Sequence, residues 1–205
     1  MPDEIGLFEA IYSQRAIREF KSDPVPDEVV HRLIEAATKA PSGSNRQGWK
    51  FLVIRDLGLK RKIGEYYNLA RNSRYGAGAT QRSNAPARRR AASDYMAEHL
   101  HEVPVVVLAC VEHDGSTSTM SRGGSIYPAV QNFLLAARGL GLGSVITSLH
   151  KRYEQEIKTL LSIPDNVETA ALLPLGYPAD GVNYGPTKRA PVSQVTFYDR
   201  WGSSR

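Results

Sequence analysis

Four short clusters of basic, amide and hydroxyl side chains have the residue types that could bind an anionic, planar small molecule. Arginine holds phosphate through charge-assisted hydrogen bonds, while amide and hydroxyl groups orient a hydrogen-bonding ring. Each cluster alone could be a set of exposed polar residues without a function, but together they suggest a site for a phosphorylated, planar cofactor. The clusters are Arg15 with Arg18, the polar loop from Pro41 to Gln47, the turn Ile146-Thr147-Ser148, and Lys188 with Arg189.

Other chemistries find little support in the spacing of the residues. The glycines of 139–144 follow a helical pattern and precede a strand, which is the reverse of the order in a dinucleotide-binding loop. The five histidines have no paired cysteine and no H-E-x-x-H spacing, so no metal site is predicted. No G-x-S-x-G elbow is present and Cys110 lies in an apolar run, so we expect no Ser or Cys nucleophile.

The composition is that of one ordinary globular domain, with 205 residues of which 41% are apolar and 23% charged. A lone cysteine cannot form an intrachain disulfide. No unbroken apolar stretch of about 18 residues occurs, and the first ten residues are acidic and amphipathic, unlike a signal peptide. We therefore expect a cytoplasmic protein without a membrane span.

The formal charge of +5 is concentrated between residues 60 and 100, a segment that contains nine lysines and arginines but only three acidic residues. A basic stripe is the electrostatic footprint of nucleic-acid binding, but no base-reading motif accompanies the run 88–90. A solvated helix face, or a cap that attracts an anionic small molecule, is the alternative explanation.

The elements that must position the four clusters are helices that alternate with a few buried strands. This order places the fold in the α+β or α/β class, in three layers and within a single domain spanning 1–205. Helices are predicted at the start of 8–20 and in 27–40, 58–70, 87–101, 127–140 and 152–161. Strands are predicted in 49–54, 102–111, 144–146 and 168–177, and polar loops in 41–48, 71–84 and 113–125.

Three blocks of the sequence resemble the nitroreductase family of flavoproteins, in the family's own order. They are SQRAIREFKSDPVPDEVVHRLIEAATKAPSGSNRQGWKFLVI, then AVQNFLLAARGLGLGSVIT, and finally LLPLGYP followed by KRAP. The blocks span nearly the whole chain, with 60–125 as the poorly matched part. The resemblance implies an α+β fold of three α/β/α layers, in which a central, mostly antiparallel sheet is flanked by helices.

The resemblance also implies which residues hold the phosphate of FMN. Arg15, Ala16 and Arg18 fall in the arginine-rich motif that grips the phosphate and the ribityl chain, and Arg189 falls on its C-terminal partner. Gln14 and Ala16 stand where the family usually has Arg and Ser, which removes one charge and one hydroxyl. Lys188 or an arginine of the basic segment could compensate.

The flavin ring would be contacted by two further clusters. Pro41, Ser42, Asn45 and Gln47 match the family's P-S-x-x-N-x-Q loop, whose Pro41 and Ser42 would come from the partner subunit. Thr147 and Ser148 match the segment that faces N5 of the ring, and their hydroxyls are most similar to the deiodinase-like branch, where such a group favours one-electron chemistry. Alternatively, these two hydroxyls cap the following helix.

The quaternary structure implied by the resemblance is an obligate, domain-swapped homodimer with two FMN sites at its interface. The helix 127–140 would bury its apolar face against its twin, and a C-terminal arm at 186–205 would wrap the partner. The basic segment 60–100 would form the variable lid over the site.

We therefore expect an FMN-dependent oxidoreductase that takes electrons from NAD(P)H in a ping-pong cycle. The acceptor would be an electron-poor compound such as a nitroaromatic, a quinone or an enone. Because the cofactor performs the chemistry, no side chain is expected to act as a catalytic acid or base. Two alternatives stay open: a deiodinase-like reductive dehalogenase or another specialised branch, and a flavin- or nucleic-acid-binding protein with little turnover.

Overall fold

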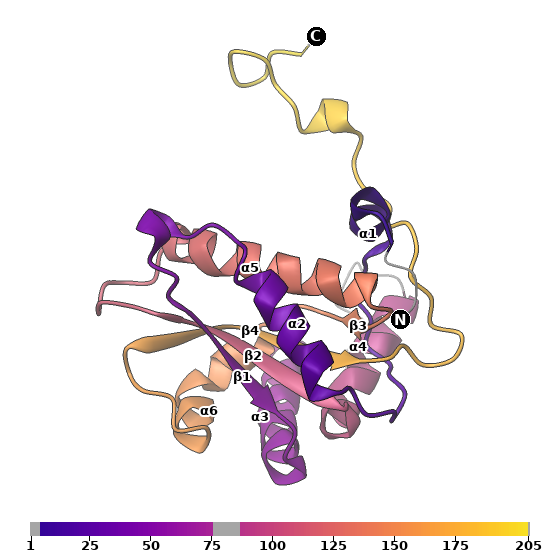
Figure 1. Ribbon diagram of the computed structural model, residues 1–205, viewed down its shortest axis with the longest axis vertical. Coiled ribbons are helices and arrows are strands. Elements are labelled where there is room, and N and C mark those ends of the chain that lie inside the picture. Colours follow the sequence, from indigo (N-terminus) through magenta and orange to yellow (C-terminus); the bar gives the residue numbers. More distant parts are fainter. Residues whose placement is uncertain (1–4, 76–86, 205) are drawn as a thin grey trace.

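The central sheet is built from the apolar runs of the sequence. The computed structural model describes residues 5–75 and 87–204, and four antiparallel strands pair in the order β1-β2-β4-β3 (Figure 1). Seven of the eight residues of β2 are buried, as expected for a central strand covered on both faces. The strands are β1 Trp49–Ile54, β2 Val105–Glu112, β3 Gly143–Ser144 and β4 Val167–Gly176.

Helices cover both faces of this sheet, so the predicted three-layer α+β class is confirmed (Figure 1). Helices α2 Asp27–Ala37 and α5 Met120–Gly139 pack on one face, and a short α1, Leu7–Ser13, lies near the C-terminal end of α5. The other face is covered by α3 Leu57–Tyr75, α4 Ala87–His99 and α6 Glu154–Leu160. Short 3-10 turns are η1 Gly43–Asn45, η2 Leu100–Glu102, η3 Leu149–Tyr153 and η4 Val192–Gln194.

The alternation of side chains along β2 divides the interior into two cores. Val107 and Ala109 point into the core beneath α2 and α5, while Leu108 and Cys110 point into the core beneath α3. Burial raises the pKa of the Cys110 thiol to about 12. Because only a thiolate is an effective nucleophile, Cys110 is an inert core residue, in agreement with the sequence analysis.

Several predicted boundaries are wrong: the helix expected at 27–40 ends at Ala37, and the strand expected at 102–111 begins at Val105. Two loop boundaries also differ. The residues 120–125 were expected in a loop, but α5 already begins at Met120, because the Thr119 side chain accepts a hydrogen bond from the Arg122 backbone N–H and caps the helix. The loop expected at 71–84 starts later, since α3 continues to Tyr75. The remainder of that loop, 76–84, lies outside the described residues.

No helix in the described part of the chain is both long and apolar enough to cross a membrane. Across residues 5–75 and 87–204, no group of three or more metal-binding side chains is found.

Candidate functional site

The edge of the sheet brings the first arginine cluster beside the third cluster. Ala16 pairs in parallel with Ser144 of β3, and the Ile17 N–H donates to the Ser144 carbonyl over 3.1 Å. Ile17 packs directly on Gly143, where an added Cβ would lie only 2.6 Å from the Ile17 Cγ2. Arg15 and Arg18 flank this contact, so both arginines belong to segments next to β3.

The chain continues from β3 along the edge to Thr147 and Ser148. Thr147 exchanges two backbone hydrogen bonds with Leu172 of β4, of 3.1 and 2.9 Å, and its Oγ1 lies 2.8 Å from the hydroxyl of Tyr67. Ser148 is exposed and occupies the N-cap position of η3 without a side-chain cap bond. Neither hydroxyl therefore caps the following helix.

The loop Pro41–Gln47 is held in an unusual backbone conformation. Ser44, Asn45 and Gln47 all have positive φ, between 51° and 53°, which side-chain-bearing residues rarely adopt. The Gln47 N–H donates to the Ser42 hydroxyl over 3.0 Å, and the Gln47 side-chain amide donates to Asn45 over 3.2 Å. Clustered backbone strain of this kind is typical of ligand-binding loops.

This loop lies at the opposite end of α5 from the arginine-bearing edge (Figure 1). The Gly43 N–H donates to the Ser125 hydroxyl in the first turns of α5, whereas Arg138 in its last turn donates to the Ser13 hydroxyl of α1. A helix of 20 residues is about 30 Å long. Within one chain, the loop and the edge therefore lie far apart.

The fourth cluster lies on the side of the arginine-bearing edge. The Gly185 N–H donates to the Ser13 carbonyl over 3.1 Å, and the Tyr184 ring lies under the Arg138 guanidinium at 4.1 Å. Arg189 follows four residues later and is exposed. Beyond it, the chain leaves the body of the molecule as an extended arm (Figure 1).

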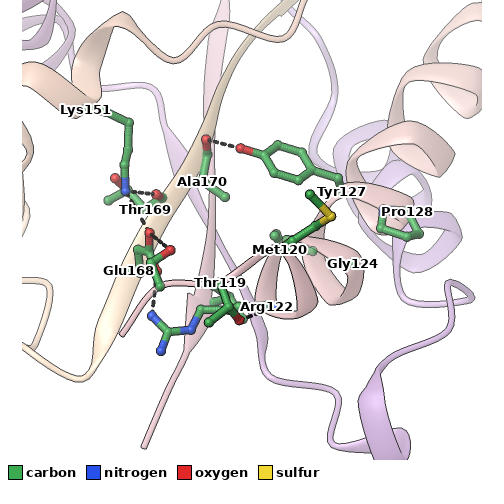
Figure 2. A pocket seen from close by; sticks show the side chains of 14 residues that line it. Thr119, Met120, Arg122, Gly124, Tyr127, Pro128, Lys151, Glu168, Thr169 and Ala170 are labelled. Atoms are coloured by element: carbon green, nitrogen blue, oxygen red, sulfur yellow. Dashed lines mark hydrogen bonds and ion pairs between the residues drawn. The ribbon is translucent and has the colours of Figure 1, made fainter. Parts of the chain in front are cut away.

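A network of polar side chains that the sequence analysis missed joins η3, β4 and α5. Arg122 Nη1 donates to Glu168 over 2.6 Å, and Lys151 Nζ contacts Glu168 at 3.1 Å and Glu154 at 2.8 Å. The network borders a cavity of about 420 Å³, with the Tyr127 ring on its other side (Figure 2). The only local signal was the i,i+3 pair of Lys151 and Glu154.

Next to this network in the chain, His150 is completely buried. The Thr169 hydroxyl donates to Glu154, so His150 Nε2–H donates to Thr169 Oγ1 over 3.1 Å and Nδ1 is the unprotonated nitrogen. Burial, followed by the charge of Lys151, lowers the pKa of His150 to about 4.

We predict that the free energy of unfolding decreases as the pH falls from about 6.5 to 4. In this window His150 is protonated in the unfolded chain but not in the native state. The free energy of unfolding therefore decreases by up to about 1.4 kcal/mol per pH unit. Urea unfolding across this window measures the slope. His150→Gln, which cannot take up a proton, should flatten it, and an unchanged slope in that variant would contradict the prediction.

The sequence model of the nitroreductase family matches residues 11–177. The chain belongs to the nitroreductase family. This confirms the resemblance drawn from the sequence, and with it the prediction of an oxidoreductase.

Among the relatives of this nitroreductase-family chain, the NADH dehydrogenase of Thermus thermophilus is 26% identical over 203 residues, which cover 92% of this chain and 94% of that protein. Iodotyrosine deiodinase 1 of Rattus norvegicus is 28% identical over 195 residues, covering 92% of this chain and 68% of that protein. A solved structure of oxidised iodotyrosine deiodinase bound to FMN and 3-iodo-L-tyrosine is 26% identical with a TM-score of 0.74, covering 94% of this chain and all of that one.

The sheet edge of this nitroreductase-family chain has a buried polar group that would fit FMN. The hydroxyl of Ser144 is buried at the sheet edge and has no hydrogen-bond partner among the described residues. A buried polar atom without a partner is costly, and a polyhydroxylated ligand would satisfy it. Together with the two flanking arginines, this orphaned hydroxyl fits a phosphorylated ribityl chain.

Proposed function

We propose that the protein is an FMN-dependent oxidoreductase that uses NAD(P)H and reduces an electron-poor acceptor, such as a nitroaromatic, a quinone or an enone. The observation that carries the proposal is the sheet edge of this nitroreductase-family chain. There the backbone between Arg15 and Arg18 pairs with Ser144, whose buried hydroxyl has no partner among the described residues. When bound, FMN would supply the hydride and electron transfer that no side chain can perform.

The residues of the edge would hold and orient the cofactor. Arg15, Arg18 and Arg189 would bind the phosphate through charge-assisted hydrogen bonds, and Ser144 would bind the ribityl chain. Ile146, whose side chain is 41% exposed, would support the apolar face of the ring. In a ping-pong cycle, NAD(P)H leaves before the acceptor enters the same space.

The whole segment 60–100 cannot form the expected lid, because Ile63 and Tyr67 of α3 and Met96 of α4 are buried in the core. Residues 76–86 of that segment lie outside the described residues.

A second copy of the chain would complete each site. Because the loop Pro41–Gln47 and the arginine-bearing edge lie at opposite ends of α5, an antiparallel pairing of two such helices brings the loop of one chain to the edge of the other. The C-terminal arm supports this homodimer, since Val192, Val195 and Trp201 are 68–91% exposed in the single chain. An apolar groove of about 510 Å³ between α1, α2 and α5 could receive the arm of the partner.

The absorption spectrum of the purified protein tests the proposal directly. We expect a yellow protein whose flavin band is bleached by anaerobic addition of NADH or NADPH. A colourless protein that does not take up added FMN would contradict the proposal, and would favour a binding protein in which Gln14 and Ala16 mark a lost cofactor site. A salt-sensitive gel shift would then identify nucleic acid as its ligand.

Mixing two variants tests whether each site is shared between subunits. Arg15→Ala/Arg18→Ala damages the edge and Asn45→Ala damages the loop, so each homodimer should retain little FMN. In a randomly mixed population, half of the dimers are mixed and each has one intact site, so about a quarter of the wild-type FMN content should return.

As the matched control, the edge variant is mixed with a second variant protein, Arg189→Ala. Both variants damage the arginine-bearing edge, so no mixed dimer has an intact site and no FMN should return. Absence of recovery in the edge-and-loop mixture would show that the site lies within one chain.

A reductive dehalogenase of the deiodinase-like branch is the second candidate function. It is favoured by the iodotyrosine deiodinases among the relatives and by the hydroxyl pair Thr147 and Ser148. Release of halide from a halotyrosine by dithionite-reduced protein would support it. We infer a cytoplasmic location for either enzyme.

A further inference from the structure

The segment 147–153 connects the sheet edge to α6, and α3 contacts it at both ends. The hydroxyl of Tyr67 lies 2.8 Å from Thr147 Oγ1. The ring of the neighbouring Tyr66 stacks on Tyr153, with the two centroids 5.5 Å apart. Two adjacent tyrosines of one helix therefore hold the two ends of the segment.

Tyr67 places a polar phenol in an otherwise apolar core. Its side chain is only 2% exposed and packs in the apolar core with Ile63 and Leu108. A buried phenol is costly unless its hydroxyl is hydrogen-bonded, and Thr147 provides a partner. Since the backbone of Thr147 is also paired with Leu172 in both directions, Thr147 is fixed through its main chain and its side chain.

The fixed orientation of Thr147 decides where its neighbours point. Successive side chains of an extended segment alternate between two sides, so Ile146 and Ser148 are turned away from the side on which Thr147 meets Tyr67. Both are exposed, and Ser148 makes no cap hydrogen bond that would occupy its hydroxyl. Ser148, and not Thr147, therefore presents its hydroxyl on the outer face of the edge.

Given the proposed FMN site, we propose that Tyr67 is a positioning residue, which holds the partly buried Thr147 against the core and thereby aims the Ser148 hydroxyl at N5 of the flavin. Thr147 is then an anchor of the segment and does not contact the ring. A serine hydroxyl both donates and accepts a hydrogen bond, so it suits N5 whether or not that nitrogen carries a proton.

A double-mutant cycle between Tyr67→Phe and Ser148→Ala, read as the FMN dissociation constant of the apoprotein, tests this role. Tyr67→Phe keeps the ring in the core and removes only the hydroxyl. It should raise the dissociation constant about fivefold, as expected for one hydrogen bond, but less than about twofold in the Ser148→Ala background. Tyr66→Phe is the matched control, which keeps the stacked ring and should leave FMN binding unchanged.

An equal increase in both backgrounds, or no increase in either, would overturn the positioning role. Should Tyr67→Phe not fold, Thr147→Val removes the other hydroxyl of the pair, keeps the branched shape, and carries the same expectation. If the wild-type apoprotein binds no FMN, the proposed function and the positioning role both fail. If it binds FMN and the two substitutions are additive, only the positioning role fails.

Discussion

Gly143→Ala is expected to weaken FMN binding by about a hundredfold or more. The added methyl would lie 2.6 to 3.0 Å from three carbon atoms of Ile17, so the segment that carries Arg15 and Arg18 must move away from the sheet edge. Overpacking of this kind costs about 1–3 kcal/mol of stability. In addition, the displaced arginines lose charge-assisted contacts with the phosphate, each of which contributes about 1.5–3 kcal/mol.

The measurement is FMN titration of the apoprotein, together with thermal unfolding of the same sample. Gly64→Ala in α3 is the matched control, because its new methyl would meet the Leu100 Cβ at an ordinary 3.7 Å. It should bind FMN like the wild type. A folded Gly143→Ala protein that also binds FMN normally would show that the arginine-bearing edge does not hold the cofactor.

The sequence was sufficient to predict the strands of the sheet, because the composition and length of each apolar run indicate a strand. The apolar runs of β1 and β2 have strand length and β-branched residues, and β1 was placed at 49–54 as observed. The start of α5 could not be placed in the same way. Residues 120–125 have no apolar periodicity, and the helix begins there because of the Thr119 cap and the bond from Gly43 to Ser125.

From the residues alone, the candidate site was predictable only in its residue types, and the family resemblance added that Pro41 and Ser42 would come from a partner subunit. The separation of the loop from the arginine-bearing edge within one chain depends on the length of α5, which the sequence analysis underestimated. Similarly, Thr147 and Ser148 were indistinguishable as neighbouring hydroxyls. Only the pairing of Thr147 with Leu172, and its contact with Tyr67, assigns them to opposite sides of the edge.

Glu168→Gln is expected to lower the free energy of unfolding at neutral pH by about 3 kcal/mol, because removing one partner of a largely buried ion pair leaves the other charge uncompensated. The Glu168 side chain is 20% exposed and that of Arg122 is 12% exposed. Burial alone would raise the pKa of Glu168, but hydrogen bonds from Arg122 and Lys151 outweigh it and lower the pKa to about 2. Glutamine keeps the size of the side chain, removes the charge, and replaces one accepting oxygen with an NH2 donor.

The pH dependence of this effect distinguishes lost charge from lost packing. A carboxyl group whose native pKa is lowered stabilises the fold above its unfolded value of about 4.5, and this contribution disappears as the pH falls towards 2. The difference between the wild type and Glu168→Gln, measured by urea unfolding, should therefore shrink across that window. Glu112→Gln breaks an ion pair with Lys50 whose side chains are about half exposed, and should cost less than about 0.5 kcal/mol. Equal losses in the two variants, or a difference that persists unchanged at low pH, would mean that the Glu168 charge does not join α5 to β4.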